Sequence, residues 1–329
     1  MNLRRQGLNL FKILFAVGLV FWLIKTDRFK LEELKPFLSP TNYLMGLVFL
    51  GLNLTLMSER WRLLMRVQSL EAQAWPTWKL NMTGIFFNFA VPGGVGGDVV
   101  KAYYLQKELG CSRAAAFSSA LMDRVVGLYT CILMALVALI YERLTAVEPQ
   151  ALLLELLAWV SFLFAALTLG LLAVGFVRYP SSWRSRSGLL GRFARFAEAC
   201  QDFIKRPGLL LMGVGLTVFA QLVTVVFFRW AFQSVLAESV SWSLLLFVVP
   251  VGFMIMAVPI TPAGVGVGQA VFYFLFQSFS QNQILNGSSV ITAFQLMQFT
   301  WGLLGAYFYL TRRPPVSLSS LEESTRERL

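Results

Sequence analysis

Two long apolar segments of this chain are interrupted by glycine and proline, and this feature constrains the fold most strongly. Residues 80–105 are broken by PGGVGG, and residues 244–281 are broken by VPITPAGVGVG. Each half has only about 12–18 residues, whereas a helix needs about 20 apolar residues to cross a bilayer. Irregular backbone at membrane depth is tolerated only where it is buried in protein or lines a cavity. The interruptions therefore predict two re-entrant hairpins or pairs of half-helices.

Six other apolar segments are long enough to cross a bilayer without interruption. The first follows Arg4 and Arg5 and has no small-residue cleavage site before Lys25, so we expect an uncleaved span. The chain is 57% hydrophobic and 14% charged, whereas a soluble domain has about 25% charged residues. The sequence thus predicts an all-α polytopic membrane protein with six full spans and two re-entrant segments. Eight spans, with the interruptions as tight turns, is the alternative. The six segments are residues 8–24, 43–64, 112–140, 151–177, 209–231 and 288–311.

The basic residues follow the positive-inside rule in this arrangement. With both termini in the cytoplasm, most of the 28 Lys and Arg residues lie on the cytoplasmic side. Topology then explains the net charge of +11, and no nucleic-acid partner is expected. Residues 1–311 form a single transmembrane domain, 312–329 a cytoplasmic tail and 178–207 a basic cytoplasmic loop. That loop is either an amphipathic helix on anionic headgroups or a solvated segment.

The residue types for several kinds of catalysis are missing. The chain has no histidine, and its three cysteines lack metal-ligand spacing. These absences exclude histidine-based catalysis, histidine-ligated metals and a Ser-His-Asp triad. The stretch GGVGGD also lacks the G-K-[ST] ending of a nucleotide-binding loop. We therefore expect no cofactor, no metal and no enzymatic activity.

Three short motifs recur in the same order in the two halves of the chain. An odd number of crossings in each half makes the halves antiparallel. Inverted repeats with broken helices at matching positions are typical of secondary transporters, which bind their substrate at the breaks. We expect pseudo-repeats over about 8–140 and 151–311, with the two breaks meeting near the bilayer midplane. The motif pairs are Pro92–Asp98 with Pro262–Gln269, Arg60-Trp61 with Arg229-Trp230, and Leu121–Gly127 with Leu296–Gly302, where Gln298 stands in the place of Asp123.

Residues at the first break are candidates for binding a phosphate-bearing group. A helix is expected to begin at Gly97-Asp98; its free N–H groups suit a phosphate, and Lys101 lies one turn further on. Asp98 is either a helix cap only or a functional carboxylate that needs a cation. Arg124 is the candidate for that cation. It lies with Asp123 in a predicted span, either as an intramembrane site or as a pair at the membrane surface.

Other candidates lie at the end of the second span and at the second break. Arg60 and Arg62 are either topology anchors or a clamp on a headgroup phosphate. Asn88 is a polar residue just before the first break, and the second break is neutral. The full set of candidates is Arg60, Arg62, Asn88, Pro92, Gly93, Gly94, Gly96, Gly97, Asp98, Lys101, Asp123, Arg124, Pro262, Gly264, Gly266 and Gln269.

The motifs RWRLL, GIFFNFAVPGGVGGDVVK, ALMDRVVGL and VPITPAGVGVG together resemble the flippase-like transmembrane region of the lysylphosphatidylglycerol synthase family. The resemblance covers residues 8–311. It implies a helical fold with paired re-entrant segments in the cytoplasmic (inner) membrane of a prokaryote, and a role in moving a lipid between leaflets. Full-length synthases carry a soluble aminoacyl-transferase domain after this region. Only a short tail follows Thr311 here, so we expect a stand-alone member that does not make lysylphosphatidylglycerol.

The family's second motif commonly ends in glutamate where this chain has Gln269, which argues against a cation-binding or proton-coupled role there. We expect a lipid flippase-like protein whose partner is a membrane phospholipid or another phosphate-bearing lipid. One alternative is a carrier of a polyprenyl-phosphate lipid. The other is a non-transporting scaffold for a lipid-modifying enzyme, with residues 178–207 as the docking surface. A homo-oligomer and a lipid-biosynthesis enzyme are the protein partners to consider.

Overall fold

The computed structural model describes Lys25 and residues 31–90, 96–145, 151–176, 201–203, 205–258, 260–280 and 285–312. The described residues form helices and connections, with no strand among them, which confirms the predicted all-helical class. The helices before the second half are η1 (Leu31–Leu38), α2 (Pro40–Val67), α3 (Ala74–Ala90), α4 (Gly96–Leu109), α5 (Arg113–Thr145) and α6 (Ala151–Phe176). The later ones are α9 (Pro207–Trp230), η2 (Ala231–Val235), α10 (Trp242–Met256), η3 (Pro262–Gly264), α11 (Val267–Phe279) and α12 (Gly287–Leu310).

Three of the described helices are long and apolar enough to cross a membrane: α2, α5, and α9 continued by η2. Helix α2 and the α9–η2 segment contain the predicted spans 43–64 and 209–231, and α5 begins at Arg113, one residue after the start of the predicted span 112–140. The predicted spans 151–177 and 288–311 correspond to α6 and α12, but α6 has a shorter apolar stretch, Glu155–Leu171. Polar residues such as Gln295 and Gln298 make α12 less apolar. The predicted span 8–24 lies outside the described residues, and the number of crossings stays a prediction.

Both predicted interruptions divide helices. Helix α3 ends at Ala90 and α4 begins at Gly96, and α10 and α11 are separated by the short η3 helix. The four helices have 17, 14, 15 and 13 residues. At about 1.5 Å per residue, even the longest is about 26 Å long, shorter than the hydrocarbon core of about 30 Å. Lengths of this kind fit half-helices, although re-entrance itself stays a prediction.

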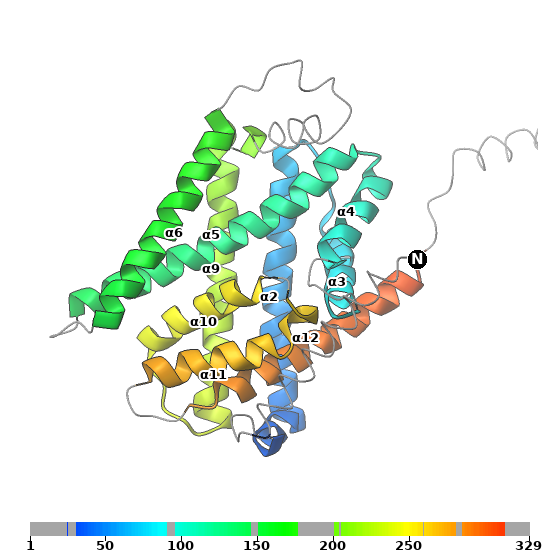
Figure 1. The fold of residues 1–329 in the computed structure, drawn as a ribbon. Coiled ribbons are helices and arrows are strands. Elements are labelled where there is room, and N and C mark those ends of the chain that lie inside the picture. Colours follow the sequence, from blue (N-terminus) through cyan, green and yellow to red (C-terminus); the bar gives the residue numbers. More distant parts are fainter. Residues whose placement is uncertain are drawn as a thin grey trace, which may run out of the picture.

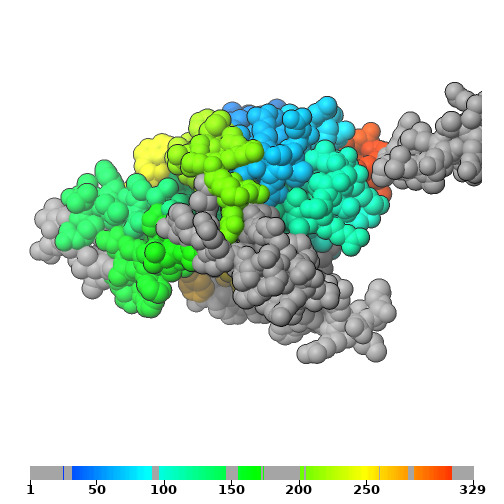
Figure 2. Space-filling model, turned by 90° about the horizontal axis from the view of Figure 1, so that it is seen from above, coloured from blue at the N-terminus to red at the C-terminus, as the bar shows by residue number. Residues whose placement is uncertain are grey.

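Helices α2 and α9 run antiparallel through the middle of the molecule (Figure 1). Arg206, before α9, donates a hydrogen bond to the carbonyl of Arg66 at the end of α2. At the other end, the rings of Phe37 and Trp230 lie 6.5 Å apart. Figure 2 shows the end of the molecule where the end of α2, the α4–α5 turn and the start of α9 come together.

The broken segments α3–α4 and α10–α11 have matching neighbours in the two halves of the chain. Helix α3 packs on α4 and on α12, whereas α10 packs on α11 and on α5. Each broken segment thus contacts the last long helix of the other half, α12 or α5. The two halves interlock, and the two breaks are brought to the same part of the molecule.

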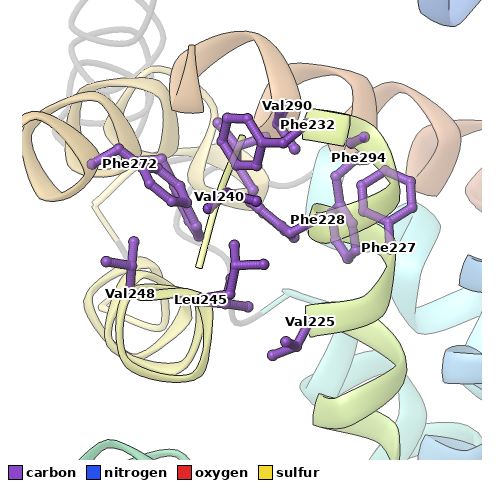
Figure 3. Packing of buried hydrophobic residues seen from close by; sticks show 14 of the residues in the cluster. Val225, Phe227, Phe228, Phe232, Val240, Leu245, Val248, Phe272, Val290 and Phe294 are labelled. Carbon is purple, nitrogen blue, oxygen red and sulfur yellow. The ribbon is translucent and has the colours of Figure 1, made fainter. Parts of the chain in front are cut away.

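The largest apolar core among the described residues is centred on the second half and also includes residues of η1, α2 and α5 (Figure 3). Phe228 of α9 stacks on Phe272 of α11 with ring centroids 5.1 Å apart, and Phe294 of α12 lies at 6.2 Å from Phe228. All three rings are buried. This packing of aromatic rings holds α9, α11 and α12 together beside the second break.

Candidate functional site

A cavity of about 190 Å³ lies between the two breaks. One wall comes from the end of α3, just before the first break, and the opposite wall from the end of α10 and the second break. Helices α5 and α12 complete it. The structure therefore brings the helix end before the first interruption and the residues of the second interruption to one cavity, which we call the central cavity. Its lining residues are Ile85, Asn88, Phe89, Arg124, Phe253, Met256, Ala257, Thr261, Ala263, Gly264 and Gln298.

An ion pair joins Arg124 in the cavity wall to α4. The Arg124 Nε and Asp98 Oδ2 atoms are 2.9 Å apart, and both side chains are partly exposed. This contact supplies the cation that the sequence analysis required for Asp98. Beside it, the Oδ1 atom of Asn88 accepts a hydrogen bond of 3.0 Å from the Gly97 N–H. Asn88 thus ties the end of α3 to the first turn of α4.

Thr261 is a polar cavity residue whose hydroxyl has no hydrogen-bond partner within the described part of the protein. The residue is 2% exposed. A buried polar atom without a partner costs about 1–3 kcal/mol. A ligand oxygen in the cavity would satisfy this hydroxyl, so its position indicates a place for a polar group.

A second group of charges is buried next to α4, outside the lining of the central cavity. Asp123 Oδ1 lies 2.7 Å from Arg60 Nε, and Asp123 Oδ2 lies 3.6 Å from Lys101 Nζ. The three residues are 5–7% exposed. We call Arg60, Lys101 and Asp123 the buried charge cluster; it carries one net positive charge.

The cluster is supported by polar and aromatic neighbours. Arg60 donates a hydrogen bond of 3.2 Å to the hydroxyl of Thr217 in α9. The Lys101 ammonium lies 4.3 Å from the centre of the Trp61 ring, a cation–π contact. Such contacts lower the cost of holding charges away from water. The cluster thereby connects α2, α4, α5 and α9.

Helical geometry explains why Asp123 and Arg124 belong to different groups. Adjacent residues on an α-helix point about 100° apart and do not face each other. Asp123 therefore points to Arg60 in α2, and Arg124 points to the cavity and Asp98. Asp123 and Arg124 therefore contact different partners, and their depth in the membrane stays a prediction.

The second break is held by amides in place of charges. Gln269 accepts a hydrogen bond of 2.7 Å from the Gly266 N–H, and it donates to Gln295 at 2.7 Å. Gln295 in turn donates to the Ala263 carbonyl at 3.2 Å. Gly264, in the cavity wall, has a φ of 71°, a backbone conformation that favours glycine. The break is thus fixed to α12 without an ionisable group.

The structure separates the predicted site residues into distinct places. Asn88, Arg124 and Gly264 line the central cavity, Gly97 and Asp98 contact its lining residues, and Pro262, Gly266 and Gln269 belong to the second break. Arg60, Lys101 and Asp123 form the buried cluster. Arg62 pairs with Glu59 on its own helix, and Gly96 begins α4. Pro92, Gly93 and Gly94 lie outside the described residues.

Sequence reasoning missed Thr261, Gln298 and Thr217. Thr261 and Gln298 line the central cavity, and Thr217 contacts Arg60. Thr261 could have been found as a polar residue within the apolar stretch VPITPAG. Gln298 could have been found because it occupies the position of Asp123 in the repeated motif. No group of three or more His, Cys, Asp or Glu side chains suited to a metal occurs in the described ranges.

Long apolar helices around a small polar cavity define an α-helical membrane protein. The sequence model of the family described as the lysylphosphatidylglycerol synthase transmembrane region matches residues 9–305 of the 329-residue chain. The protein therefore belongs to this family. Membership supports a lipid-related role in a membrane. No curated protein and no solved structure matches the chain.

Proposed function

We propose that this protein moves a phospholipid between the two leaflets of the cytoplasmic membrane. The observation that carries the proposal is the central cavity. It combines a guanidinium group with a buried hydroxyl that has no hydrogen-bond partner among the described residues. Binding sites at paired helix breaks are typical of transporters built from inverted repeats. The matching neighbours of the broken segments in the two halves support such a repeat.

The cavity chemistry suits a phosphate. Arg124 places a guanidinium group in the cavity lining, and a guanidinium fork fits phosphate oxygens well. The Thr261 hydroxyl and the Gln298 amide are further donors in the lining. A volume of about 190 Å³ has room for a small headgroup only. The acyl chains would remain in the bilayer while the headgroup crosses.

In this proposal, Asp98 competes with the headgroup phosphate for the guanidinium group of Arg124. An empty cavity keeps Arg124 neutralised by Asp98, and a phosphate that enters draws the guanidinium toward itself. The chain has no nucleotide-binding loop. Transport is therefore downhill or coupled to an ion gradient, and the protein is a transporter with no enzymatic reaction of its own.

Reconstitution in liposomes tests the proposal. The wild-type protein should move fluorescent phospholipids between leaflets faster than protein-free liposomes do. Arg124→Ala and Thr261→Val should each lower the initial rate by about tenfold, the effect of about 1.4 kcal/mol. A parallel arm with labelled polyprenyl phosphate distinguishes that substrate class.

Two variants serve as controls in this assay. Arg143→Ala removes an arginine from the last turn of α5, and Thr145→Val removes an exposed hydroxyl near it, both away from the cavity lining. Their transport rates should equal that of the wild type. Absence of movement of every lipid tested would refute translocation. Equal rates for all four variants and the wild type would place the site elsewhere.

A further inference from the structure

A second cavity, of about 600 Å³, lies at the other end of the α3–α4 pair. It is lined by the start of α3, the end of α4 and the end of α12, and we call it the hairpin-base cavity. Along α3, Lys79 in this cavity and Asn88 in the central cavity are two and a half turns apart, about 14 Å. The volume is within the range of ligand pockets, about 300–1,000 Å³.

The hairpin-base cavity contains charges of both signs. Glu108 of α4 and Arg312 after α12 form an ion pair, and the Arg312 guanidinium lies 4.2 Å from the centre of the Tyr104 ring. Glu71 and Lys79 also line the cavity. Among the described residues neither has an ion-pair partner, and the Lys79 ammonium lies 5.5 Å from the Trp75 ring. One carboxylate and one ammonium group therefore remain available to a ligand.

Aromatic residues lie next to this cavity. Trp75 and Trp78 stack with ring centroids 5.2 Å apart, and Phe308 of the cavity lining contacts both rings. Trp75 is 58% exposed. In membrane proteins, exposed tryptophans gather at the level of the lipid headgroups. The basic residues Lys79 and Arg312 at the same end agree with a cytoplasmic position.

We infer that the hairpin-base cavity binds the headgroup of a zwitterionic aminophospholipid from the cytoplasmic leaflet. Lys79 contacts the phosphate, and Glu71 contacts the ammonium group. The acyl chains lie along Trp75 and Phe308 toward the bilayer. A purely anionic headgroup would leave Glu71 without a partner and next to negative charge. This site goes beyond the proposed translocation, because binding here requires no movement of the lipid across the membrane.

Native mass spectrometry of the full chain in detergent measures this binding. The probes are phosphatidylethanolamine and phosphatidylglycerol with the same acyl chains, and soluble glycerophosphoethanolamine. The wild type should bind phosphatidylethanolamine about tenfold more tightly than phosphatidylglycerol, the effect of about 1.4 kcal/mol. Glu71→Gln should abolish this preference. Lys79→Gln should weaken both lipids by about tenfold, and Lys79→Arg should restore them.

Matched controls separate this site from general surface charge. Lys107 also lies over an aromatic ring, Tyr103, at 4.9 Å, but it does not line the cavity. Glu32 is an exposed carboxylate in η1. Lys107→Gln and Glu32→Gln should bind both lipids as the wild type does. Thermal melting of each variant checks that it is folded.

Three results would overturn the inference. The first is equal binding of the two lipids by the wild type, and the second is unchanged binding by Glu71→Gln and Lys79→Gln. The third is binding of glycerophosphoethanolamine as tight as that of the intact lipid, which would identify a soluble ligand. These measurements do not depend on transport. Loss of this site with normal lipid movement, or the reverse, therefore shows which of the two proposals has failed.

Discussion

The two halves of the molecule share a scheme of helix neighbours and differ in what they bury. In the first half, α2, α4 and α5 enclose Arg60, Lys101 and Asp123. In the second half, α9, α11 and α12 enclose phenylalanines such as Phe228 and Phe272. Two sets of helices with matching neighbours can therefore bury groups of very different polarity.

The repeat-related arginines show the difference most directly. Arg60 is 6% exposed and bonds the carboxylate of Asp123. Its counterpart Arg229 donates to the Val240 carbonyl at 2.7 Å and lies 4.3 Å from the Trp242 ring, near the end of α9. The position of Asp123 is occupied by neutral Gln298 in the second half. The lining of the central cavity shows the same asymmetry, because its charged residue, Arg124, comes from the first half and its residues from the second half are neutral.

The sharpest test of this asymmetry is removal of the buried carboxylate. Asp123→Ala leaves Arg60 and Lys101 buried without a counter-charge, and should destabilise the protein by about 3–5 kcal/mol. Unfolding in mixed micelles with increasing SDS measures the change. Gln298→Ala at the matching position should cost less than a third of that. Equal costs would mean that the two halves are electrostatically alike.

Glycines at the two breaks also differ in how closely other atoms surround them. A Cβ atom on Gly97 would lie 2.1 Å from the Gly84 carbonyl oxygen, so the backbones of α3 and α4 would have to separate. Gly97→Ala should therefore cost about 1–3 kcal/mol, as overpacking does. On Gly268 in α11, the nearest atoms are the end of the flexible Met256 side chain, at 3.0 Å. Gly268→Ala should cost less, measured by the same unfolding titration; the opposite order would contradict the close α3–α4 contact.

A double-mutant cycle tests the pair at the cavity. Asp98→Asn, Arg124→Gln and the double variant should give a coupling energy of about 0.2–1 kcal/mol, because the pair is partly exposed. The exchange variant, Asp98→Arg with Arg124→Asp, should recover stability without recovering lipid movement. Recovery of both would show that the pair holds the fold together and does not bind the lipid.

The smallest expected effect concerns Glu238, a carboxylate at the edge of the second half. It accepts a hydrogen bond of 3.1 Å from the Asn286 N–H before α12. Burial raises the pKa of Glu238 above its ordinary value of 4.5. Between that value and the raised pKa, the folded protein keeps a proton that the unfolded chain releases, so stability falls as pH rises through this window.

Melting temperatures measured from pH 4 upward compare the wild type with Glu238→Gln. The wild type should lose stability across the window relative to the variant, because glutamine does not titrate. Parallel pH profiles of the two proteins would show that Glu238 keeps its ordinary pKa when folded.

Much of the fold followed from local patterns. Apolar runs predicted the long helices, and the glycine and proline clusters predicted where the two broken segments end and restart. Capping residues act at the same local level, as Ser39 before α2 and Ser241 before α10 do. The need of Asp98 for a cation also led to Arg124, because few charged residues lie at membrane depth.

Long-range neighbours did not follow from these patterns. Arg60 and Asp123 are far apart in sequence, and no local rule predicts that α2 and α5 bring them within 2.7 Å. The same applies to Thr261 and Gln298, which become cavity residues only because α10 and α12 meet α3 and α5 there.

The sequence by itself determined that this is a helical membrane protein with two broken segments, because hydropathy, glycine and proline act on the nearby backbone. The tertiary structure alone decided which charges are buried together and which face a cavity. Neighbouring residues on one helix point in different directions, and the helix that each one meets is set by packing across the whole chain.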